Sequence, residues 1–342
     1  MIDLHLHLDG SLSPALVSRL GREQGLDLPQ GEELERLLQA PEDCRSLEEY
    51  LRCFQLPGEL LQSGEALEAA ARDLTQRLAA QGLLYGEIRF APQLHTRRGL
   101  TQAQAVEAVR AGAAQGCQGT ELSVQLILCC MRGGEEADNR QTLETALRYL
   151  GQGVCAADLA GAEALYPVEE YRELFSWAKA QGLPFTLHAG EAAGPESVWG
   201  AVKLGASRIG HGVRAGEDPA LLEFLKEEGI PLELCPTSNL QTKAVPSLDA
   251  FPLKAYLRGG LCVTVNTDNM TVSHTDLRRE YSLLDLSPKE GEQLLRNSVQ
   301  AAFLPPKEKE ARSMGSLERS NHSPVPSSMR KTVSALREAG SG

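Results

Sequence analysis

The chain opens with Met1-Ile-Asp-Leu-His-Leu-His-Leu-Asp-Gly10, in which every second position from Ile2 to Leu8 is apolar. Side chains alternate along a β-strand, so His5 and His7 would share one face while the leucines would face a hydrophobic layer. Two neutral imidazoles on one strand face can form half of a metal site. An isolated His-x-His pair is more often a solvated polar face, because short motifs recur freely. The metal interpretation therefore depends on further ligands elsewhere in the chain.

Seven further runs have the composition of buried strands, and helical patterns separate nearly all of them. The eight predicted strands span residues 2–8, 83–90, 122–130, 154–159, 184–188, 208–210, 230–235 and 261–266. Strands that alternate with helices pair in parallel, and eight such units predict an α/β fold of the (β/α)8 or TIM-barrel type. A doubly wound sheet is the alternative, but it typically has fewer strands, and no glycine-rich nucleotide turn follows the first strand.

Helical apolar spacing fills the segments between the strands. The predicted helices span residues 13–27, 30–40, 45–81 with a break at 56–58, 101–116, 137–150, 168–181, 195–204, 218–228, 250–258, 275–284 and 288–303. The helices before residue 81 exceed a single crossover, so we expect them to be an insertion after the first strand that covers the barrel mouth. We expect the barrel to span residues 1–314. Residues 315–342 are rich in serine and lack aromatic residues, which predicts a disordered or loosely helical tail.

The composition limits the partners and the compartment. The chain has 342 residues, of which 42% are hydrophobic, and a net charge of -12. A nucleic-acid surface would need a basic stripe, and no apolar run approaches the roughly 20 residues that span a bilayer. No basic start followed by an apolar segment indicates a signal peptide. We therefore expect a cytoplasmic protein that binds neither nucleic acid nor membrane, with its eight cysteines as buried thiols.

Polar residues gather where the predicted strands end, which is where barrel enzymes carry their catalytic groups. These residues are His5, His7 and Asp9 on the first strand, Asp158 and Gly161 on the fourth, His188 and Glu191 on the fifth, His211 on the sixth, Ser238 and Asn239 on the seventh, and Asp268 and Asn269 on the eighth. Taken singly, each is better explained as a satisfied polar residue or a helix cap. Independent caps give no reason for four histidines and a carboxylate at one end of one barrel.

This set matches the needs of a metal ion that activates water. Such an ion needs nitrogen or oxygen ligands and one open position. We expect one Zn²⁺ per chain, with its ligands supplied by His5, His7, His188 and Asp268. Glu191 lies three residues beyond a ligand, close enough to face the substrate as a proton donor. His211, on the next strand, is placed to orient the attacking hydroxide.

With these residues in this order, the chain resembles the adenosine deaminase family of the amidohydrolase superfamily across residues 1–304. The matching motifs are His5-Leu-His-Leu-Asp-Gly10, Asp158-Leu-Ala-Gly161, His188-Ala-Gly-Glu191, Arg208-Ile-Gly-His-Gly212, Cys235-Pro-Thr-Ser238 and Asn266-Thr-Asp268. Together they are highly specific, although no single one is. The resemblance implies a zinc-bound barrel that hydrolyses the 6-amino group of adenosine or deoxyadenosine to give inosine or deoxyinosine and ammonia.

The resemblance also assigns roles to individual residues. It places zinc on His5, His7, His188 and Asp268, with His7 also bordering the substrate. It implies that Glu191 protonates N1 of the purine, which makes C6 electrophilic. His211 and Asp268 would hold and deprotonate the zinc water. The Gly161 backbone would meet N3, and Asp9 would meet the ribose.

Other positions leave alternatives open. A helical stripe of Leu47, Tyr50, Leu51 and Phe54 resembles the lid over the purine, but ordinary core helices show such stripes equally often. Many members have a second aspartate where this chain has Asn269. An asparagine donates through its NH₂ without needing a proton, so we expect Asn269 to donate to N7. The alternative is a helix cap. The chain after residue 306 does not resemble the family's final helix.

The rival functions concern the substrate first. Deaminases of adenine, of AMP or of a modified adenosine remain alternatives; adenine deaminases usually carry glutamate where this chain has Asp9, and a nucleotide enzyme should present basic residues. The cytidine-deaminase signatures His-x-Glu and Pro-Cys-x-x-Cys are absent from the sequence. A non-catalytic purine-binding barrel is the alternative outside the enzymes. We expect a small-molecule purine nucleoside as the partner and a monomer or small homo-oligomer.

Overall fold

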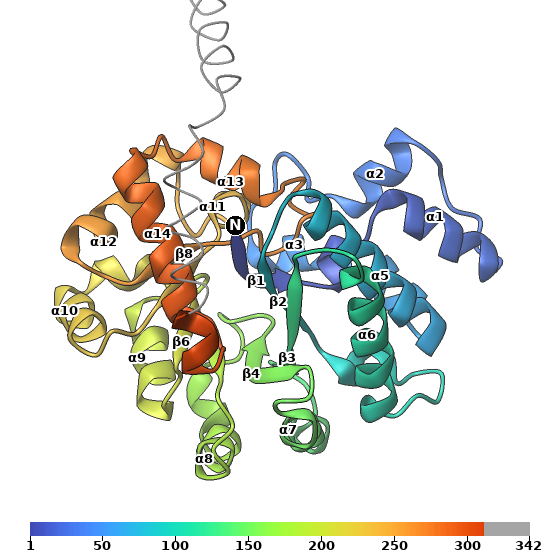
Figure 1. Ribbon diagram of the computed structural model, residues 1–342, viewed down its shortest axis with the longest axis horizontal. Helices are drawn as coiled ribbons and strands as arrows, with labels where there is room; N and C mark the ends of the chain where they lie inside the picture. Colours follow the sequence, from blue (N-terminus) through green and yellow to red (C-terminus); the bar gives the residue numbers. More distant parts are fainter. Residues whose placement is uncertain (311–342) are drawn as a thin grey trace, which may run out of the picture. The chain divides into compact units, whose positions relative to one another are not determined.

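A parallel β-barrel forms the centre of the protein in a computed structural model that describes residues 1–310 (Figure 1). Its strands are β1 (Ile2–His7), β2 (Tyr85–Phe90), β3 (Ser123–Met131), β4 (Val154–Ala160), β5 (Thr186–Ala189), β6 (Arg208–His211), β7 (Leu232–Leu234) and β8 (Val263–Val265). Contacts within the chain separate a unit of Met1–Phe303, described below, from a second unit that begins at Leu304. The predicted tail, residues 315–342, lies outside the described residues, and its boundary at 314 stays a prediction.

The barrel consists of two parallel sheets, with the strand orders β1-β2-β3-β4 and β5-β6-β7-β8. Backbone bridges join the sheets at two seams, between Ala157 and Phe185 and between Leu6 and Asp268. At the second seam the His7 amide donates to the Asp268 carbonyl over 2.7 Å, and the Asp268 amide donates to the His5 carbonyl over 2.8 Å. The predicted (β/α)8 barrel is therefore confirmed. The second seam places the first and the last of the sequence motifs, which contain His5 and Asp268, side by side.

Helices surround the strands (Figure 1). Those after β2 are α6 (Gln102–Cys117), α7 (Glu136–Tyr149), α8 (Arg172–Ala180), α9 (Pro195–Leu204), α10 (Pro219–Glu227), α11 (Pro236–Gln241), α12 (Leu253–Gly259), α13 (Leu277–Leu283) and α14 (Pro288–Ala301). The longer ones bury an apolar stripe, as Ala105, Val106 and Val109 do in α6. α14 packs against both β8 and β1, so it covers the outside of the seam that joins the first and last strands.

An insertion of helices separates β1 from β2, as predicted. It contains α1 (Pro14–Glu23), α2 (Glu32–Leu38), α3 (Leu47–Tyr50), α4 (Gln55–Leu60) and α5 (Gly64–Ala80). Cys44, Leu47, Tyr50 and Cys53 form a small apolar cluster with Val272, which follows β8. The Tyr50 hydroxyl also lies 2.7 Å from the Ser273 hydroxyl. These contacts hold part of the insertion over the end of the barrel at which β8 terminates.

Two details differ from the prediction. The expected helix break at 56–58 is wrong, because Pro57 lies inside α4. Proline is tolerated in a first helical turn, where backbone N–H groups have no intrahelical partner. The short helix α11 was not predicted, since Pro236 reads as a strand end although it also suits the first position of a helix.

Short single-turn 3-10 segments also link the elements, such as η1 (Asp9–Ser11) directly after β1. Among the described residues, none of the helices is both long and apolar enough to cross a membrane.

Candidate active site

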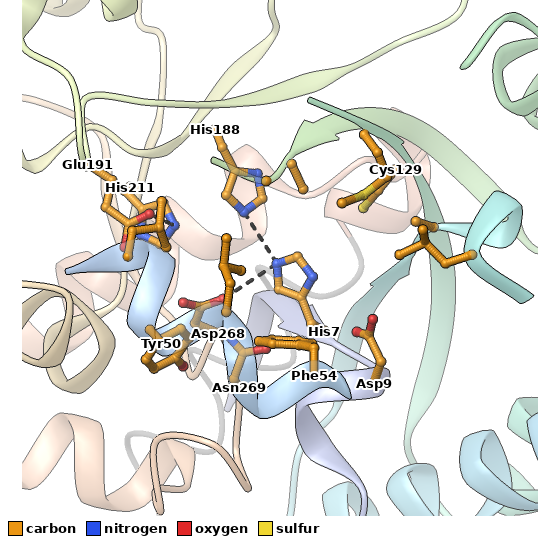
Figure 2. Close-up of a pocket in the computed structure, with 17 residues that line it drawn as sticks. His7, Asp9, Tyr50, Phe54, Cys129, His188, Glu191, His211, Asp268 and Asn269 are labelled. Carbon is orange, nitrogen blue, oxygen red and sulfur yellow. Dashed lines mark hydrogen bonds and ion pairs between the residues drawn. The ribbon is translucent and has the colours of Figure 1, made fainter. Parts of the chain in front are cut away.

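A pocket opens at the carboxyl ends of the strands, beneath the insertion (Figure 2). Its lining consists of His7, Asp9, Leu47, Tyr50, Leu51, Phe54, Ala91, Leu94, Cys129, Met131, Ala160, Gly161, His188, Glu191, His211, Asp268 and Asn269. Every residue that was assigned a catalytic, metal or substrate role lines this pocket except His5, which is fully buried. The strand-end candidates Asp158, Ser238 and Asn239 are buried but do not line it. The four insertion residues with lid-like spacing also line it. The apolar side chains come mostly from the insertion, from the segment after β2 and from β3.

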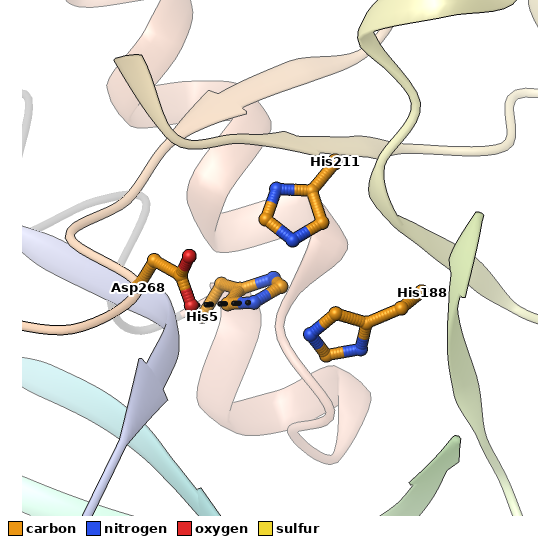
Figure 3. Close-up of side chains that lie close together, drawn as sticks. All are labelled: His5, His188, His211 and Asp268. Carbon is orange, nitrogen blue, oxygen red and sulfur yellow. Dashed lines mark ion pairs between the residues drawn. The ribbon is translucent and has the colours of Figure 1, made fainter. Parts of the chain in front are cut away.

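Four side chains form a compact cluster that can hold a metal ion (Figure 3). Ligand atoms of His5, His188, His211 and Asp268 all lie within 4.8 Å of one another. His7 lies at the edge of this cluster: its Nε2 is 3.3 Å from Nε2 of His188 and 3.4 Å from Oδ1 of Asp268. His5 Nε2 is likewise 3.4 Å from Oδ1 of Asp268. The structure thus brings three of the four predicted ligands into one cluster with His211, while the fourth, His7, contacts His188 and Asp268 from the edge of that cluster.

One atom of this cluster has no partner in the protein. His5 Nε2 is buried and makes no hydrogen bond. The other ring nitrogen, Nδ1, lies 2.8 Å from the Glu233 carboxylate. A carboxylate accepts from Nδ1–H, which leaves the lone pair of Nε2 directed into the cluster. A buried, unpaired imidazole nitrogen beside a carboxylate fits a metal ion that would occupy the space between them.

His188 is oriented in the same way from the neighbouring sheet. Its Nδ1 lies 3.0 Å from Oδ2 of Asp158, so Nε2 faces His7 and the pocket. Arg89 then ties the two orienting carboxylates together, because its guanidinium lies 2.8 Å from Asp158 and 2.9 Å from Glu233. Burial opposes ionisation of both carboxyls, but the nearby histidines and arginines outweigh it and lower the pKa of each. Both carboxylates are therefore charged at neutral pH.

His211 is held differently, and the difference bears on its role. Its Nδ1 lies 3.0 Å from the side-chain amide nitrogen of Asn239, whose oxygen accepts from the Cys235 backbone. An amide NH₂ is a donor, so Nδ1 accepts and Nε2 carries the proton of the neutral ring. That Nε2 lies 3.4 Å from Oε2 of Glu191. His211 therefore presents an N–H to the pocket, where His5 and His188 present lone pairs.

Electrostatics favour the neutral form of two of the imidazoles, His7 and His211. Burial, followed by the charges of neighbouring histidines, lowers the pKa of His211 and of His7 well below the usual range, despite the opposing charge of Asp268. Asp268 behaves oppositely: burial raises its pKa, but its close approach to His5 and to the other nearby imidazoles lowers it well below the usual range. His211 and Asp268 also adopt φ of 61° and 58°, in the left-handed region that non-glycine residues rarely occupy. Such backbone strain is typical of functional positions.

Glu191 is arranged to carry a proton. The residue is only 4% exposed, and the Thr242 hydroxyl donates to its Oε1 over 3.0 Å. Burial, together with the charges of Asp268 and Glu163, raises the pKa of the Glu191 carboxyl well above its usual range. A carboxyl with a raised pKa keeps its proton to higher pH than an exposed glutamate and can deliver that proton to a bound molecule.

The other predicted residues lie around the pocket. Asp9 has a buried carboxylate oxygen without a partner, and burial raises its pKa to about 6. Gly161 follows β4 with φ of 110°, so a side chain there would be strained. Asn269 packs on Gly10 so closely that a Cβ at position 10 would lie 1.8 Å from its Oδ1. The helix-cap alternative for Asn269 is wrong, because a turn follows it and Asp276 caps α13.

Several supporting residues were not predicted from the sequence. Glu233 and Arg89 lie on β7 and β2 and orient the ligands from below. Glu233 did leave a signal, since a glutamate between Leu232 and Leu234 in a buried strand requires a charged partner. Asn239 was noted as a strand-end residue, but its pairing with His211 could not be read from the sequence. The pocket lining contains no lysine or arginine.

Comparisons with known proteins agree on one family. The family model described as adenosine deaminase matches residues 1–314. An adenosine deaminase of Haemophilus ducreyi is 50% identical over 322 residues, which cover 91% of this chain and 94% of that protein. A crystal structure of adenine deaminase from Arthrobacter aurescens superimposes with a TM-score of 0.83 at 28% identity, covering 94% of this chain and 98% of that one. Arabidopsis ADAL complexed with IMP has a TM-score of 0.81 at 26% identity, covering 92% and 94%.

Proposed function

The chain belongs to the adenosine deaminase family and catalyses the hydrolytic deamination of adenosine or deoxyadenosine, and from this premise we propose a role for each residue of its active site. One metal ion, zinc, is held by His5, His7, His188 and Asp268. The observation that carries this proposal is the buried, unpartnered Nε2 of His5, which faces Asp268 at 3.4 Å. When bound, the metal would activate a water molecule as the nucleophile.

His7, and not His211, is the fourth ligand in this proposal. A metal ligand must offer a lone pair. Asn239 fixes the tautomer of His211 so that its Nε2 carries a proton. His7 is neutral, and its Nε2 lies within 3.4 Å of both His188 and Asp268. His211 is then free to donate its N–H to the attacking water and hold it against C6 of the purine.

Glu191 and Asp268 handle the protons. Glu191 is buried and protonated, so it can donate to N1 of the purine, which draws electron density from C6. Asp268 stays ionised in the same pocket and can accept a proton from the attacking water. The two carboxyl groups have pKa values shifted in opposite directions, Glu191 raised by burial and Asp268 lowered by its imidazole neighbours. This separation is the pattern of an acid and a base that act in one reaction.

The remaining residues bind the nucleoside. Asn269 donates to N7, the Gly161 backbone meets N3, and Asp9 accepts from the ribose. Leu47, Tyr50, Leu51 and Phe54 cover the purine. A nucleotide is disfavoured, because the 5′-phosphate would enter a pocket that offers no lysine or arginine and contains the unpartnered Asp9 carboxyl. This pocket therefore favours a nucleoside over the IMP-type ligand found in the Arabidopsis neighbour.

Ammonia release across a substrate panel tests the substrate assignment. The panel contains adenosine, deoxyadenosine, adenine and AMP. We expect both nucleosides to have a kcat/KM at least about a hundredfold above that of AMP, because a buried unpaired charge is strongly disfavoured. Adenine should be poor, because it cannot use the Asp9 side of the pocket. A higher kcat/KM for AMP or adenine than for adenosine would contradict the assignment.

A further inference from the structure

Glu163 is a buried carboxylate that no step of the reaction uses. It lies in the segment after β4 and is 3% exposed. Its two oxygens accept hydrogen bonds only from the loop after β5 and the start of α9. The donors are the backbone amides of Gly190 (2.6 Å), Glu191 (3.0 Å), Ala192 (2.7 Å) and Ala193 (3.0 Å) and the hydroxyl of Ser197 (2.5 Å).

These amides form an anion-binding concavity. Successive backbone N–H groups that converge on one point bind anions, and many proteins use such concavities for phosphate or carboxylate ligands. Here Gly190 turns the chain with φ of 73°, which allows the next amides to point inward. A Cβ on Gly190 would lie 2.6 Å from a Val198 methyl, so the turn leaves no room for a side chain. The carboxylate of Glu163 fills the concavity from within the protein.

The strand that precedes this loop is held by a buried cation. Arg132 donates from Nη2 to the His188 carbonyl over 2.7 Å and from Nη1 to the Tyr166 carbonyl over 2.5 Å. An arginine therefore holds β5 at His188, and Glu163 holds the loop that follows at Glu191. The side chains of both anchored residues, His188 and Glu191, enter the pocket (Figure 2).

We propose that Glu163 is the positioning residue for the catalytic acid: by accepting four consecutive amides of residues 190–193, it fixes the backbone from which Glu191 reaches the purine. The proposal rests on the role given above to Glu191. Glu163 does not line the pocket; it positions Glu191 through this backbone, in addition to the effect of its charge on the Glu191 carboxyl described above. Without an anion at this point, two buried and two partly buried N–H groups lose their acceptor, and the loop relaxes. A displacement of the order of an ångström at a reacting group is enough to slow a reaction by about a hundredfold.

Two variants of Glu163 separate positioning from general stability. Glu163→Gln keeps the shape but turns an NH₂ donor towards backbone donors. We expect kcat to fall by roughly ten- to a hundredfold, with KM for adenosine and metal content close to those of the unmodified protein. Glu170→Gln, an exposed carboxylate on the following 3-10 segment, is the matched control and should leave kcat unchanged. A Glu163→Gln kcat within about twofold of the parent overturns the proposal.

Glu163→Ala allows a rescue that a merely structural role would not show. The alanine leaves the concavity of amides intact but without its anion. We expect added formate to restore part of kcat in a saturable manner, because formate supplies a carboxylate of the right size for the empty concavity. The parent, Glu170→Gln and Glu191→Gln should not respond. A Glu163→Ala variant that formate does not restore overturns the proposal.

The outcomes also separate this proposal from the reaction assignment. If Glu191→Gln is inactive while Glu163→Gln is fully active, the acid role stands and the positioning role fails. If Glu191→Gln retains full activity, the acid role itself fails. Loss of activity in both variants, with formate rescue confined to Glu163→Ala, supports the two together.

Discussion

Two layers of buried charged and polar groups lie at the centre of the barrel, and they differ in what they face. The lower layer, the buried ion network, consists of Glu87, Arg89, Asp158, Arg208 and Glu233. Each of its carboxylates lies within 2.9 Å of an arginine. The upper layer lies in and beside the pocket, and four of its buried atoms have no hydrogen-bond partner: His5 Nε2, Asp9 Oδ1, Ser238 Oγ and Asn269 Oδ1. Arg89 Nε and Glu87 Oε2 in the lower layer also lack a hydrogen-bond partner, but the charges of both residues are paired.

The contrast separates scaffold from function. Burying a charge is strongly unfavourable unless it is paired, and the lower layer meets that condition within the protein. In the upper layer, the buried polar atoms named above have no partner in the protein. A metal ion or a substrate would supply that partner. Glu233 and Asp158 connect the layers, since each faces an arginine below and a ligand histidine above. The predictions below perturb one layer at a time.

The largest effect should come from Glu191 in the upper layer. Glu191→Gln keeps the shape but cannot deliver a proton to N1, and such groups contribute typically about 10²–10⁴-fold in rate. We expect kcat to fall by that factor, while thermal stability and metal content stay near those of the parent. Steady-state assays of adenosine turnover measure it, with the exposed Glu196→Gln as control. Retention of more than about a tenth of the rate would exclude the acid role.

Breaking the lower layer should affect stability before activity. Arg89→Met removes the cation between Asp158 and Glu233, which leaves Asp158 without its arginine partner while Glu233 keeps only Arg208. Removing one partner from a buried ion pair typically destabilises a protein by about 3–5 kcal/mol. Urea unfolding measures the loss. Arg296→Met, which breaks an exposed pair with Glu292, should change stability by less than about 1 kcal/mol. Equal effects of the two variants would remove the distinction between the layers.

A smaller effect is expected at Asn269. If its amide donates to N7, 7-deazaadenosine leaves that buried donor unpaired, which costs about 1–3 kcal/mol. The analogue should therefore have a lower kcat/KM than adenosine by about five- to a hundredfold. Asn269→Ala should reduce kcat/KM for adenosine far more than for the analogue. Equal reductions for both substrates would show that Asn269 does not contact N7.

The smallest effect should be a change in how the stability of the protein depends on pH, caused by Asp9. Burial raises the pKa of this carboxyl to about 6 in the folded protein, compared with about 3.9 in an unfolded chain. The folded state therefore binds the proton more tightly, and stability falls as pH rises from about 4 to about 6. Asp9→Asn removes this loss, so its melting temperature should exceed that of the parent above pH 6 and match it below pH 4. The exposed Asp249→Asn is the control. A variant that is less stable at pH 8 would show that Asp9 has a partner in the protein.

The sequence predicted most of what depends on local pattern. Strand periodicity placed all of the strands of the described barrel, and the chemistry of imidazole and carboxylate at strand ends selected the residues that line the pocket. Those signals are local, because each strand positions its own terminal side chain. The wrong helix break at Pro57 has the same origin, since proline marks both helix starts and helix ends.

The supporting contacts could not be predicted, because they join residues far apart in the chain. Nothing in Gly161-Ala-Glu163 distinguishes its glutamate from an exposed loop residue until β5 and its loop fold against it. The tautomer of His211 depends on an asparagine 28 residues away. The role of Arg89 becomes clear only in the folded barrel, where this residue of β2 lies between Asp158 of β4 and Glu233 of β7. Sequence pattern therefore locates the reacting groups, while the groups that orient them require the three-dimensional structure.

Metal content, measured together with turnover, tests most directly whether the unpaired upper layer exists to hold a metal ion. Elemental analysis of the active protein should give close to one zinc ion per chain. Removal by a chelator should abolish adenosine turnover in proportion to the metal lost, and added zinc should restore it. His211→Ala should retain the metal while His7→Ala loses most of it. A metal-free preparation that remained fully active would contradict the account.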